Sequence, residues 1–482
     1  MNSVSKKVTS SFAWKITERI VSRGISLIVQ IILARILLPS DFGSLAIIVS
    51  ITNYALLFVQ SGLSTALIRK KEIDQGDVST VLTASLVVAF IMYSILFLLS
   101  PFLSLFFEIP ELVWPIRVLS LILFLNAING VQSALLARKF KFKQILIKSL
   151  ISVPLSGIIG VIMAYMGFGI WSLIAQNMIG ILLTVVVMLF GLDYKLRIGF
   201  NWKKAKSLYA FGGKILFTNL INGLYDASRT LAIGKKYNSE SLAYYDKANT
   251  YTYYIDQIVN SSMASVLLPT FSQYQDDEKK LCEMARRSVK TTSFIMIPIL
   301  FGCASISGVL IPLLLTDKWS ACIPYFIIFC FIRIPEIIKT IDIQVYYSLG
   351  KSGLHLFYSI VMCVLSLISL SITIFISIRA VAIGALIVEY ASLIFVSIIS
   401  SKTYGYKIIS RLKDIAKPVI NSLIMAMLVY FVSYFGLHPI FTLVLQVVIG
   451  IVIYLILSFI TRDRSLQEIT FLIKSMKGKK NE

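Results

Sequence analysis

The chain has 482 residues, of which 57% are hydrophobic and only 15% are charged, and its formal net charge is +22 at pH 7. Its mean hydropathy of +0.83 excludes an ordinary soluble domain and is typical of a polytopic helical membrane protein. In so apolar a chain, the excess of Lys and Arg is explained first by helix ends that meet anionic lipid head groups. We therefore expect membrane lipids, and no nucleic acid, among its partners.

The sequence predicts about fourteen apolar stretches of about twenty residues, each long enough to cross a ~30 Å hydrocarbon core as a helix. The predicted spans are 12–33, 43–64, 79–105, 112–137, 145–166, 169–191, 208–233, 247–274, 288–315, 322–349, 355–378, 380–400, 416–436 and 438–460. The connections between them are too short for a folded extramembrane domain. We therefore expect the functional groups to lie in or beside the bilayer.

Lys and Arg are concentrated in alternate connections. With the N-terminus inside, the inward-facing connections hold clusters at 69–71, 138–148, 195–206 and 279–290, whereas the outward-facing ones hold few cations. This bias is the positive-inside rule, and it predicts that both termini are cytoplasmic. The residues after the last span spread apolar side chains along one helical face among cations, which fits a short helix on the inner leaflet.

An internal repeat divides the first twelve spans into two halves. Phe12 to Lys15 aligns with Phe211 to Lys214 at an offset of 199 residues, and the same offset brings Ser40-Asp41 onto Ser239-Glu240. Matches in this order predict two pseudo-symmetric six-helix lobes, an arrangement in which transporters build a central site. The predicted all-α architecture has a first lobe over 1–191, a basic cytosolic linker over 192–206, a second lobe over 207–401, a helix pair over 402–460 and a basic tail over 461–482.

Charged residues inside the first span mark a candidate site. Lys15, Arg19 and Arg23 recur every four residues and share one face of the predicted helix, with Glu18 close to Lys15. A charge at the centre of a spanning helix costs about 2.5 to 3.5 kcal/mol on insertion scales, so we expect this face to meet water or an anion. Lys15 could equally be an anchor that snorkels to the inner surface.

Later spans carry further charges. The repeat-related span 208–233 has Lys214, Asp226 and Arg229, and the span 247–274 has Asp256. The span 322–349 alternates in sign every three residues, through Arg333, Glu336, Lys339 and Asp342. These residues could line a cavity, or pair with one another and lock the lobes together. The Asn and Gln residues of these spans are better explained as hydrogen-bond donors between helices than as ligands.

The chain offers little material for catalysis. Five cysteines are scattered without CxxC spacing, and the two histidines, His355 and His438, are far apart. The sequence has no Walker A pattern GxxxxGK[ST], which argues against intrinsic ATP hydrolysis. We expect no catalytic residues, no metal and no cofactor, and therefore a protein that is not an enzyme.

Three segments carry a family resemblance. They are ILARILLPSDFG at 32–43, SESLAYYDKA at 239–248 and LLARKFKF at 135–142. The first two resemble the matching first loops of the two lobes in bacterial polysaccharide transporters. The similarity extends over nearly the whole chain, which resembles the O-antigen and exopolysaccharide flippases of the multidrug/oligosaccharidyl-lipid/polysaccharide superfamily, with their MATE-like fold.

The resemblance implies export of an undecaprenyl-diphosphate-linked oligosaccharide across the bacterial inner membrane, by alternating access between two lobes. In such relatives the cations of the first helix contact the diphosphate, which implies this role for Lys15, Arg19 and Arg23. Arg and Lys can replace the hydration of a diphosphate with charge-assisted hydrogen bonds. We add to this anion site Lys214, Arg229, Arg333 and Lys339. The candidates for coupling to a proton or sodium gradient are Glu18, Asp226, Asp256 and Glu336.

Other classes of protein compete with this interpretation. An ion-coupled multidrug exporter of the same superfamily would have the same helices, but its cavity for organic cations should be acidic rather than cationic. A membrane polymerase or glycosyltransferase would need a sizeable outer loop with catalytic carboxylates, and the sequence has none. A structural scaffold would not need cations on repeat-related helices. We expect polymerase and assembly proteins as partners of the transporter instead.

Overall fold

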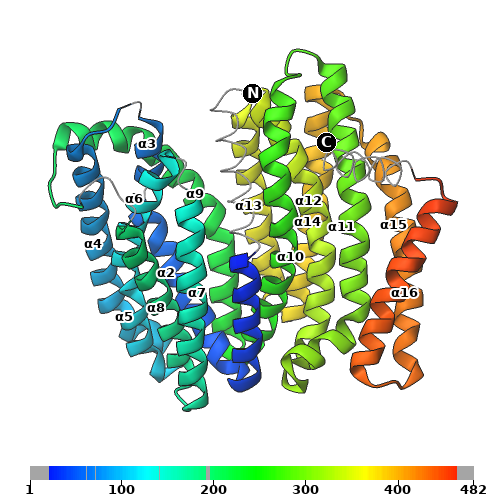
Figure 1. Ribbon diagram of the computed structural model, residues 1–482, viewed down its shortest axis with the longest axis horizontal. Helices are drawn as coiled ribbons and strands as arrows, with labels where there is room; N and C mark the ends of the chain where they lie inside the picture. The colour runs from blue at the N-terminus through cyan, green and yellow to red at the C-terminus, as the bar shows by residue number, and fades with distance from the viewer. Residues whose placement is uncertain (1–20, 61, 71, 140–141, 191–195, 464–482) are drawn as a thin grey trace, which may run out of the picture. The chain divides into compact units, whose positions relative to one another are not determined.

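The computed structural model describes residues 21–60, 62–70, 72–139, 142–190 and 196–463. All regular secondary structure in these ranges is helical (Figure 1). The chain forms two compact units, one up to Asp246 and one from Lys247. Lys15, Glu18, Arg19 and most of the predicted tail lie outside the described residues. The predicted division into two lobes, linker and helix pair stays a prediction.

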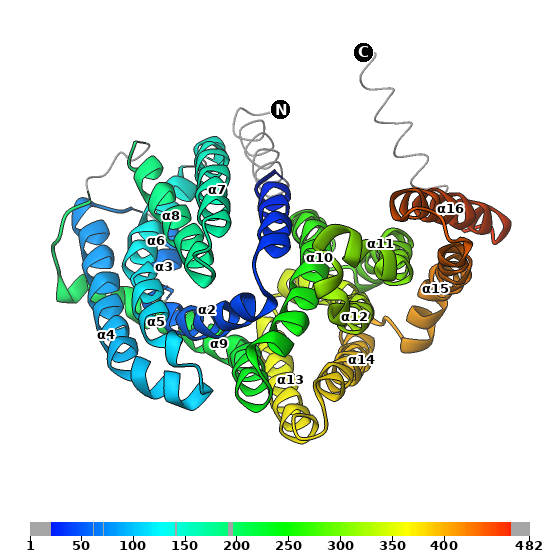
Figure 2. The same cartoon turned by 90° about the horizontal axis from the view of Figure 1, so that it is seen from below.

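In the first unit, the first described helix covers residues 21–36. It continues with α2 (Pro39–Gln60), α3 (Leu63–Arg69), α4 (Gln75–Phe107), the 3-10 turn η1 (Pro110–Leu112), α5 (Val113–Ser120), α6 (Ile122–Arg138), α7 (Phe142–Tyr165), α8 (Ile170–Leu189) and α9 (Trp202–Lys236). Helix α10 (Ser239–Ser272) begins in this unit and continues into the second. Within the unit, α2 packs on α9 and α4, and α7 lies beside α8 (Figure 2).

Polar residues at helix starts explain where two of these helices begin. The Asp74 carboxylate accepts from the Asp77 N–H at 2.7 Å and the Asp77 carboxylate accepts from the Asp74 N–H at 3.1 Å, a capping box that starts α4. The Asn201 side chain caps α9 by accepting from the Lys204 N–H at 3.2 Å. The segment before Asn201 is hydrogen-bonded to Thr83 of α4 through Gly199. The described part of the predicted linker is therefore fixed along α4 and the first turn of α9.

The second unit contains the rest of α10 followed by α11 (Glu278–Leu315), η2 (Asp317–Cys322), α12 (Ile323–Ser348), α13 (Ser352–Thr373), α14 (Ile378–Tyr404), α15 (Ile408–Phe431), η3 (Val432–Phe435) and α16 (Pro439–Ile460). Helix α12 packs against both α11 and α14, and α15 and α16 pack against α11 (Figure 2). The Tyr454 hydroxyl of α16 donates to the carbonyl of Phe294 in α11 at 2.8 Å, which helps to fix the last helix in place.

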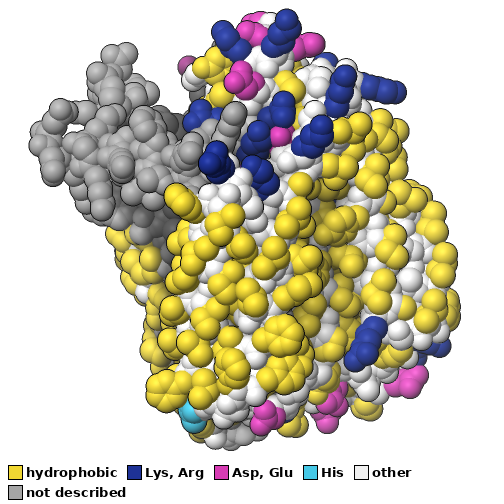
Figure 3. Space-filling view, turned by 90° about the vertical axis from the view of Figure 1, so that its right-hand side faces the viewer, with side chains coloured by type: hydrophobic (Ala, Val, Ile, Leu, Met, Phe, Trp, Pro, Cys, Tyr) yellow, Lys and Arg dark blue, Asp and Glu magenta, His cyan; other side chains and the backbone are white. Residues whose placement is uncertain are grey.

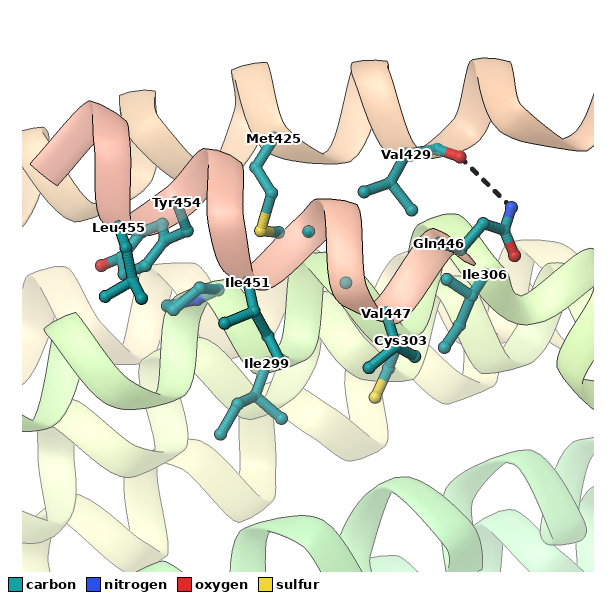
Figure 4. Close-up of a pocket in the computed structure, with 13 residues that line it drawn as sticks. Ile299, Cys303, Ile306, Met425, Val429, Gln446, Val447, Ile451, Tyr454 and Leu455 are labelled. Carbon is teal, nitrogen blue, oxygen red and sulfur yellow. Dashed lines mark hydrogen bonds between the residues drawn. The ribbon is translucent and has the colours of Figure 1, made fainter. Parts of the chain in front are cut away.

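An apolar pocket lies among α11, α15 and α16 (Figure 4). Its volume is about 350 Å³, and its lining includes Ile299, Cys303, Met425 and Ile451. At one edge the Gln446 amide donates to the Val429 carbonyl at 3.2 Å, so that this polar group is bound to α15. The pocket is therefore a gap in helix packing that favours apolar contents.

The outer surfaces of the helices are apolar, as a bilayer requires. In the described ranges, eleven helical segments are long and apolar enough to cross a membrane. Large apolar side chains cover the flank drawn in Figure 3, and Lys and Arg gather at one end of it. The chain is thus a multi-pass membrane protein.

The predicted count of fourteen helices stays a prediction. Helices α9 and α10 are as long as the other spans, but polar residues keep them out of the group of eleven. Helix α11 also extends beyond the predicted 288–315, because its charged first turns continue the helix past its apolar part. Helices α5 and α6 divide the predicted span 112–137 near Leu121.

Candidate functional site

The second unit buries a line of charged side chains along α12. Arg333, Lys339 and Asp342 have side chains that are only 6%, 7% and 1% exposed, and Glu336 lies between the first two. Uncompensated charges at this depth would be strongly destabilising. Each of them has a partner on α12 itself or on another helix of the same unit. The charged residues that alternate in sign along α12 thus pair mostly with residues of neighbouring helices.

Arg333 joins α12 to α10. Its Nη1 donates to Glu336 at 2.6 Å, and its Nη2 donates to the Asn249 side-chain oxygen at 2.5 Å and the Asn249 carbonyl at 3.3 Å. The guanidinium also lies 5.4 Å from the centre of the Tyr253 ring, a cation–π distance. Its Nε is buried and has no acceptor among the described residues. Arg333 therefore holds α10 through both a main-chain and a side-chain oxygen.

Lys339 joins α12 to α13 and α14. Its ammonium group donates to Glu389, to the Ser392 hydroxyl at 2.6 Å and to the Tyr358 hydroxyl at 3.0 Å. An ammonium group has three N–H donors, so these partners satisfy all of them. We did not predict Glu389 from the sequence. It is the acidic residue of the predicted span 380–400, and a carboxylate at membrane depth is itself a signal of a buried partner.

Asp256 of α10 completes this cluster. It is 5% exposed, its carboxylate accepts from the Asn260 amide at 2.6 Å, and it interacts electrostatically with Glu336, Arg333 and Glu389. The cluster has three carboxylates, on Asp256, Glu336 and Glu389, but only two cations, on Arg333 and Lys339. With all five groups ionised, it therefore carries one surplus negative charge.

A second network joins α12 to α14 and α15. Arg411 donates to the two oxygens of Asp342 at 2.6 and 2.7 Å, and the same carboxylate accepts from Ser400 at 2.8 Å and from Tyr404. Arg411 lies 4.5 Å from the centre of the Tyr406 ring. These contacts fill most of the positions at which the Asp342 carboxylate can accept a hydrogen bond.

Asp414 extends this network to α11. It accepts from Arg286 at 2.9 and 3.0 Å and from the Tyr406 hydroxyl at 3.0 Å, and Lys290 lies 3.2 Å away. We did not predict Arg411 or Asp414 as site residues, because both precede the predicted span 416–436. The contacts of Arg411 and Asp414 together fasten α15 to the centre of the unit.

The predicted residues of the first unit are less closely grouped. Arg229 pairs with Asp226 at 3.0 Å, and its guanidinium lies 5.2 Å and 5.6 Å from the ring centres of Tyr225 and Tyr245. Arg23 is exposed on the first described helix. Lys214 lies on α9, but its side chain is outside the described part of the structure. The proposed diphosphate site as a whole therefore stays a prediction.

Metal binding finds no support in this geometry. Among the described residues, no group of three or more His, Cys, Asp and Glu side chains is placed to hold a metal ion. The buried carboxylates instead bind Arg, Lys, hydroxyl and amide donors. The arrangement is suited to holding paired charge in a membrane interior.

Comparison with known proteins identifies a matching protein family. The family model described as polysaccharide biosynthesis protein matches residues 32–324. The succinoglycan biosynthesis transport protein ExoT of Rhizobium meliloti is 25% identical, with 98% of this chain and 97% of ExoT covered. The lipopolysaccharide biosynthesis protein WzxC of Escherichia coli is 24% identical, with 68% of this chain and 67% of WzxC covered.

Solved structures with the same fold are transporters. The lipid II flippase MurJ in an inward closed conformation has a TM-score of 0.77 at 17% identity, with 93% of this chain and 98% of MurJ covered. An inward-facing MATE multidrug transporter has a TM-score of 0.63 at 14% identity, with 83% of this chain and 98% of the transporter covered. The predicted all-α, MATE-like polytopic fold is thereby confirmed.

Proposed function

Because this chain belongs to the polysaccharide biosynthesis protein family, we propose that it translocates a lipid-linked oligosaccharide across a membrane for surface polysaccharide biosynthesis. The observation that carries the proposal is a family match over most of the chain, together with a fold shared with a lipid II flippase. A relative covering nearly the whole chain is named as a biosynthesis transport protein.

The drug-exporter alternative has weaker support. The sequence relatives carry names from polysaccharide biosynthesis, whereas the MATE transporter shares only the fold, at a lower TM-score than MurJ. Export of organic cations would also call for an acidic cavity. The cations predicted on the first span instead favour an anionic cargo.

The proposed cargo is anchored through undecaprenyl diphosphate. A diphosphate cannot cross hydrocarbon unless protein donors replace its water, and Arg and Lys do so with charge-assisted hydrogen bonds. Arg333 and Lys339 would have to release Glu336 and Glu389 before binding it. Arg229 would likewise have to release Asp226. We therefore assign the first contact with the diphosphate to the other predicted cations, which are Lys15, Arg19, Arg23 and Lys214.

The same proposal places the protein in the bacterial cytoplasmic membrane with both termini inside. The positive-inside distribution of Lys and Arg supports this orientation, and the cargo then moves outward. A polysaccharide polymerase and assembly proteins would receive it on the outer side. The lipid of the cargo would stay in the bilayer during translocation.

Coupling to a proton or sodium gradient is supported by the charge balance around α12. The cluster of Asp256, Glu336 and Glu389 with Arg333 and Lys339 has one surplus negative charge, and one proton or sodium ion would neutralise it. Burying an unbalanced charge is costly, so occupancy by the ion would favour one arrangement of the cluster over another. The other two coupling candidates are Glu18 and Asp226.

The test is the leaflet distribution of lipid-diphosphate-linked oligosaccharide in cells depleted of this protein. Wild type, the Arg19→Ala/Arg23→Ala variant and the Lys279→Ala/Lys280→Ala variant are supplied back at matched membrane abundance. Lys279 and Lys280 are exposed near the start of α11, so they control for the loss of two cations.

We expect depletion to accumulate the cargo on the cytosolic face, and wild type and the Lys279/Lys280 variant to relieve it. The Arg19/Arg23 variant should fail to do so. An unchanged distribution on depletion would refute the function. Normal transport by the Arg19/Arg23 variant would refute only the assignment of the anion site.

A further inference from the structure

Polar side chains are exposed along one face of α2. All of α2 is described, and its only exposed residues are Asn53 and Gln60, which are seven residues apart and therefore share a face. The neighbouring helix α4 differs, because every exposed residue along it is apolar, from Val87 to Phe106. Lipid suits the surface of α4, whereas an exposed carboxamide in the middle of a spanning helix calls for water or a polar ligand.

Helix α9 carries the same kind of residues at the same spacing. Asn219 and Asp226 are exposed and are also seven residues apart, and the Asp226 side chain is 68% exposed. Phe217 and Leu224 are exposed as well, but they lie about 160° round the helix from this pair. Helix α9 therefore has one exposed side that is polar and another that is apolar.

Helices α2 and α9 lie side by side in the first unit (Figure 2). A Cβ atom placed on Gly223 would lie 3.1 Å from Cδ1 of Leu57, and one placed on Gly234 would lie 3.0 Å from Cδ1 of Ile47. The two helices thus touch along a line that passes through these glycines. Residue numbers rise along α2 as they fall along α9, so the helices are antiparallel.

The polar residues of both helices lie on the same side of this line. On α9, Asn219 and Asp226 are rotated from the line by about 40° to 60°, and on α2 the two polar residues are rotated in the same sense by about 90°. In antiparallel helices, equal senses of rotation lead to the same side. The glycine contacts put Asn53 level with Asp226. Gln60 is level with Asn219 in the same way, two turns or about 10 Å further along.

The amides of these four residues, which we call the α2–α9 polar strip, have unused hydrogen-bonding capacity. Among the described residues, the side chains of Asn53, Gln60 and Asn219 have no hydrogen-bond partner. Gln132 behaves differently, because its amide donates to the Val185 carbonyl of α8 at 3.0 Å and so joins two helices. Each free carboxamide offers two N–H donors and an acceptor oxygen. Bonds between helices therefore explain Gln132 but not the polar strip.

The polar strip presents no unpaired charge. Its one carboxylate, on Asp226, pairs with Arg229 of the same helix at 3.0 Å, and the Arg229 side chain is only 11% exposed. The guanidinium lies 5.2 Å and 5.6 Å from the ring centres of Tyr225 and Tyr245. A diphosphate needs cations, and an organic cation needs an unpaired carboxylate. A neutral surface of donors and acceptors suits hydroxyl groups, each of which can both donate and accept.

We propose that the α2–α9 polar strip is a sugar-binding surface that holds hydroxyl groups of the cargo oligosaccharide. This inference rests on the proposed function, and it assigns the sugar and the diphosphate to different residues. The distance of about 10 Å between its two levels lets the strip contact more than one sugar ring. A cargo that lacks a matching hydroxyl would leave an amide without a partner, so the strip would also contribute to sugar specificity.

A comparison of two ligands tests the polar strip. Purified protein is titrated with the lipid-diphosphate-linked oligosaccharide extracted from depleted cells, and separately with undecaprenyl diphosphate, which carries no sugar. The proteins are wild type, Asn53→Ala/Asn219→Ala and, as a matched control, Asn126→Ala/Asn177→Ala. The two control amides donate to main-chain carbonyls of their own helices at 3.0 and 2.8 Å.

We expect wild type and the control to bind the glycosylated lipid more tightly than the sugar-free one. The Asn53/Asn219 variant should lose about tenfold in affinity for the glycosylated lipid, because it lacks two hydrogen-bonding groups, and should bind undecaprenyl diphosphate like wild type. A variant that keeps its full preference for the glycosylated lipid would overturn the inference. So would an equal loss of affinity for both lipids.

The same titration separates this inference from the proposed function. A wild type that binds both lipids equally well would overturn the sugar-binding surface and leave the function standing. If wild type binds neither lipid, and depletion leaves the leaflet distribution unchanged, the function itself fails.

A second measurement does not depend on transport or on the double variant. In a background without the native cysteines, Asn219→Cys and, as its control, Phe217→Cys are labelled with a water-soluble maleimide. Phe217 is 62% exposed but lies on the apolar side of α9. We expect labelling to be severalfold faster at residue 219, and to slow there when the glycosylated lipid is bound. Equal rates at the two positions, or no protection by the glycosylated lipid, would contradict the inference.

Discussion

Removing Arg411 tests how firmly α15 is held to the rest of its unit. In Arg411→Met, the carboxylate of Asp342 loses two hydrogen bonds of 2.6 and 2.7 Å and keeps the hydroxyls of Ser400 and Tyr404. The carboxylate is only 1% exposed, so water cannot replace the guanidinium. Breaking a buried pair in this way costs about 3 to 5 kcal/mol, because one charge is left without compensation.

That cost is large enough to measure as a decrease in melting temperature. At about 2 to 4 °C per kcal/mol for a domain of 150 to 250 residues, the Tm of the second unit should fall by roughly 6 to 20 °C. The assay is thermal unfolding of purified protein in detergent, followed by the fluorescence of Trp319, which is fully buried in this unit, in a background whose other four tryptophans are replaced by Phe. Lys280→Met is the control, because it breaks an exposed pair of 3.6 Å with Asp277 and should leave the Tm unchanged.

A double variant separates the cost of an unpaired charge from the value of the pair. Asp342→Leu/Arg411→Met removes both charges and should recover most of the lost stability, since an apolar replacement of a buried ion pair is often neutral. Two results would refute this reasoning. One is an Arg411→Met protein that melts with wild type, and the other is a double variant less stable than either single variant.

Two further predictions concern one ion pair in each of the two units. Glu389→Gln removes the carboxylate that pairs directly with the buried ammonium of Lys339, so we expect a loss of about 3 kcal/mol that Lys339→Met/Glu389→Gln largely reverses. An unchanged Tm in the single variant would contradict this prediction. In the first unit, hydrogen bonds from the Lys204 ammonium and the Asp77 N–H lower the pKa of Asp74 to about 2. Because the pKa in the folded state is lower than the unfolded value near 4, the ionised carboxylate stabilises the fold fully above that pH. This stabilisation is lost as the pH falls further. The Tm difference between wild type and Asp74→Asn should thus stay constant from pH 8 to 5 and close between about pH 4 and 2, and a change between pH 8 and 5 would argue against it.

The helices were predictable because a bilayer imposes a strong and local condition on sequence. A run of about twenty apolar residues is visible without any knowledge of packing, and the all-α polytopic fold follows from many such runs. Helices α9 and α10 are the exceptions. The sequence predicted them as apolar stretches like the others, but their polar residues lower the hydropathy and keep them out of the group of eleven.

The ion pairs were not predictable in the same way. Lys339 and Glu389 are 50 residues apart in the chain, and Asp342 and Arg411 are 69 apart, so no periodic pattern joins them. Arg411 also lies in a stretch whose cations indicate an inner loop by the positive-inside rule. The structure buries it instead, because α15 extends about two turns before its apolar part begins.

The two kinds of contact in this molecule differ in what it costs to break them. Around α12, ion pairs hold α14 and α15 in place and a hydrogen bond from the Arg333 guanidinium to Asn249 holds α10, so opening one of these contacts would leave a charge in the membrane interior without its partner. Between the starts of α2 and α10, main chains pack closely with apolar side chains and a hydroxyl pair. A carrier needs parts that move without deforming, so its motion should occur where separation exposes only apolar and neutral surface. On this physical ground, the helices of the α12 networks should move as one body.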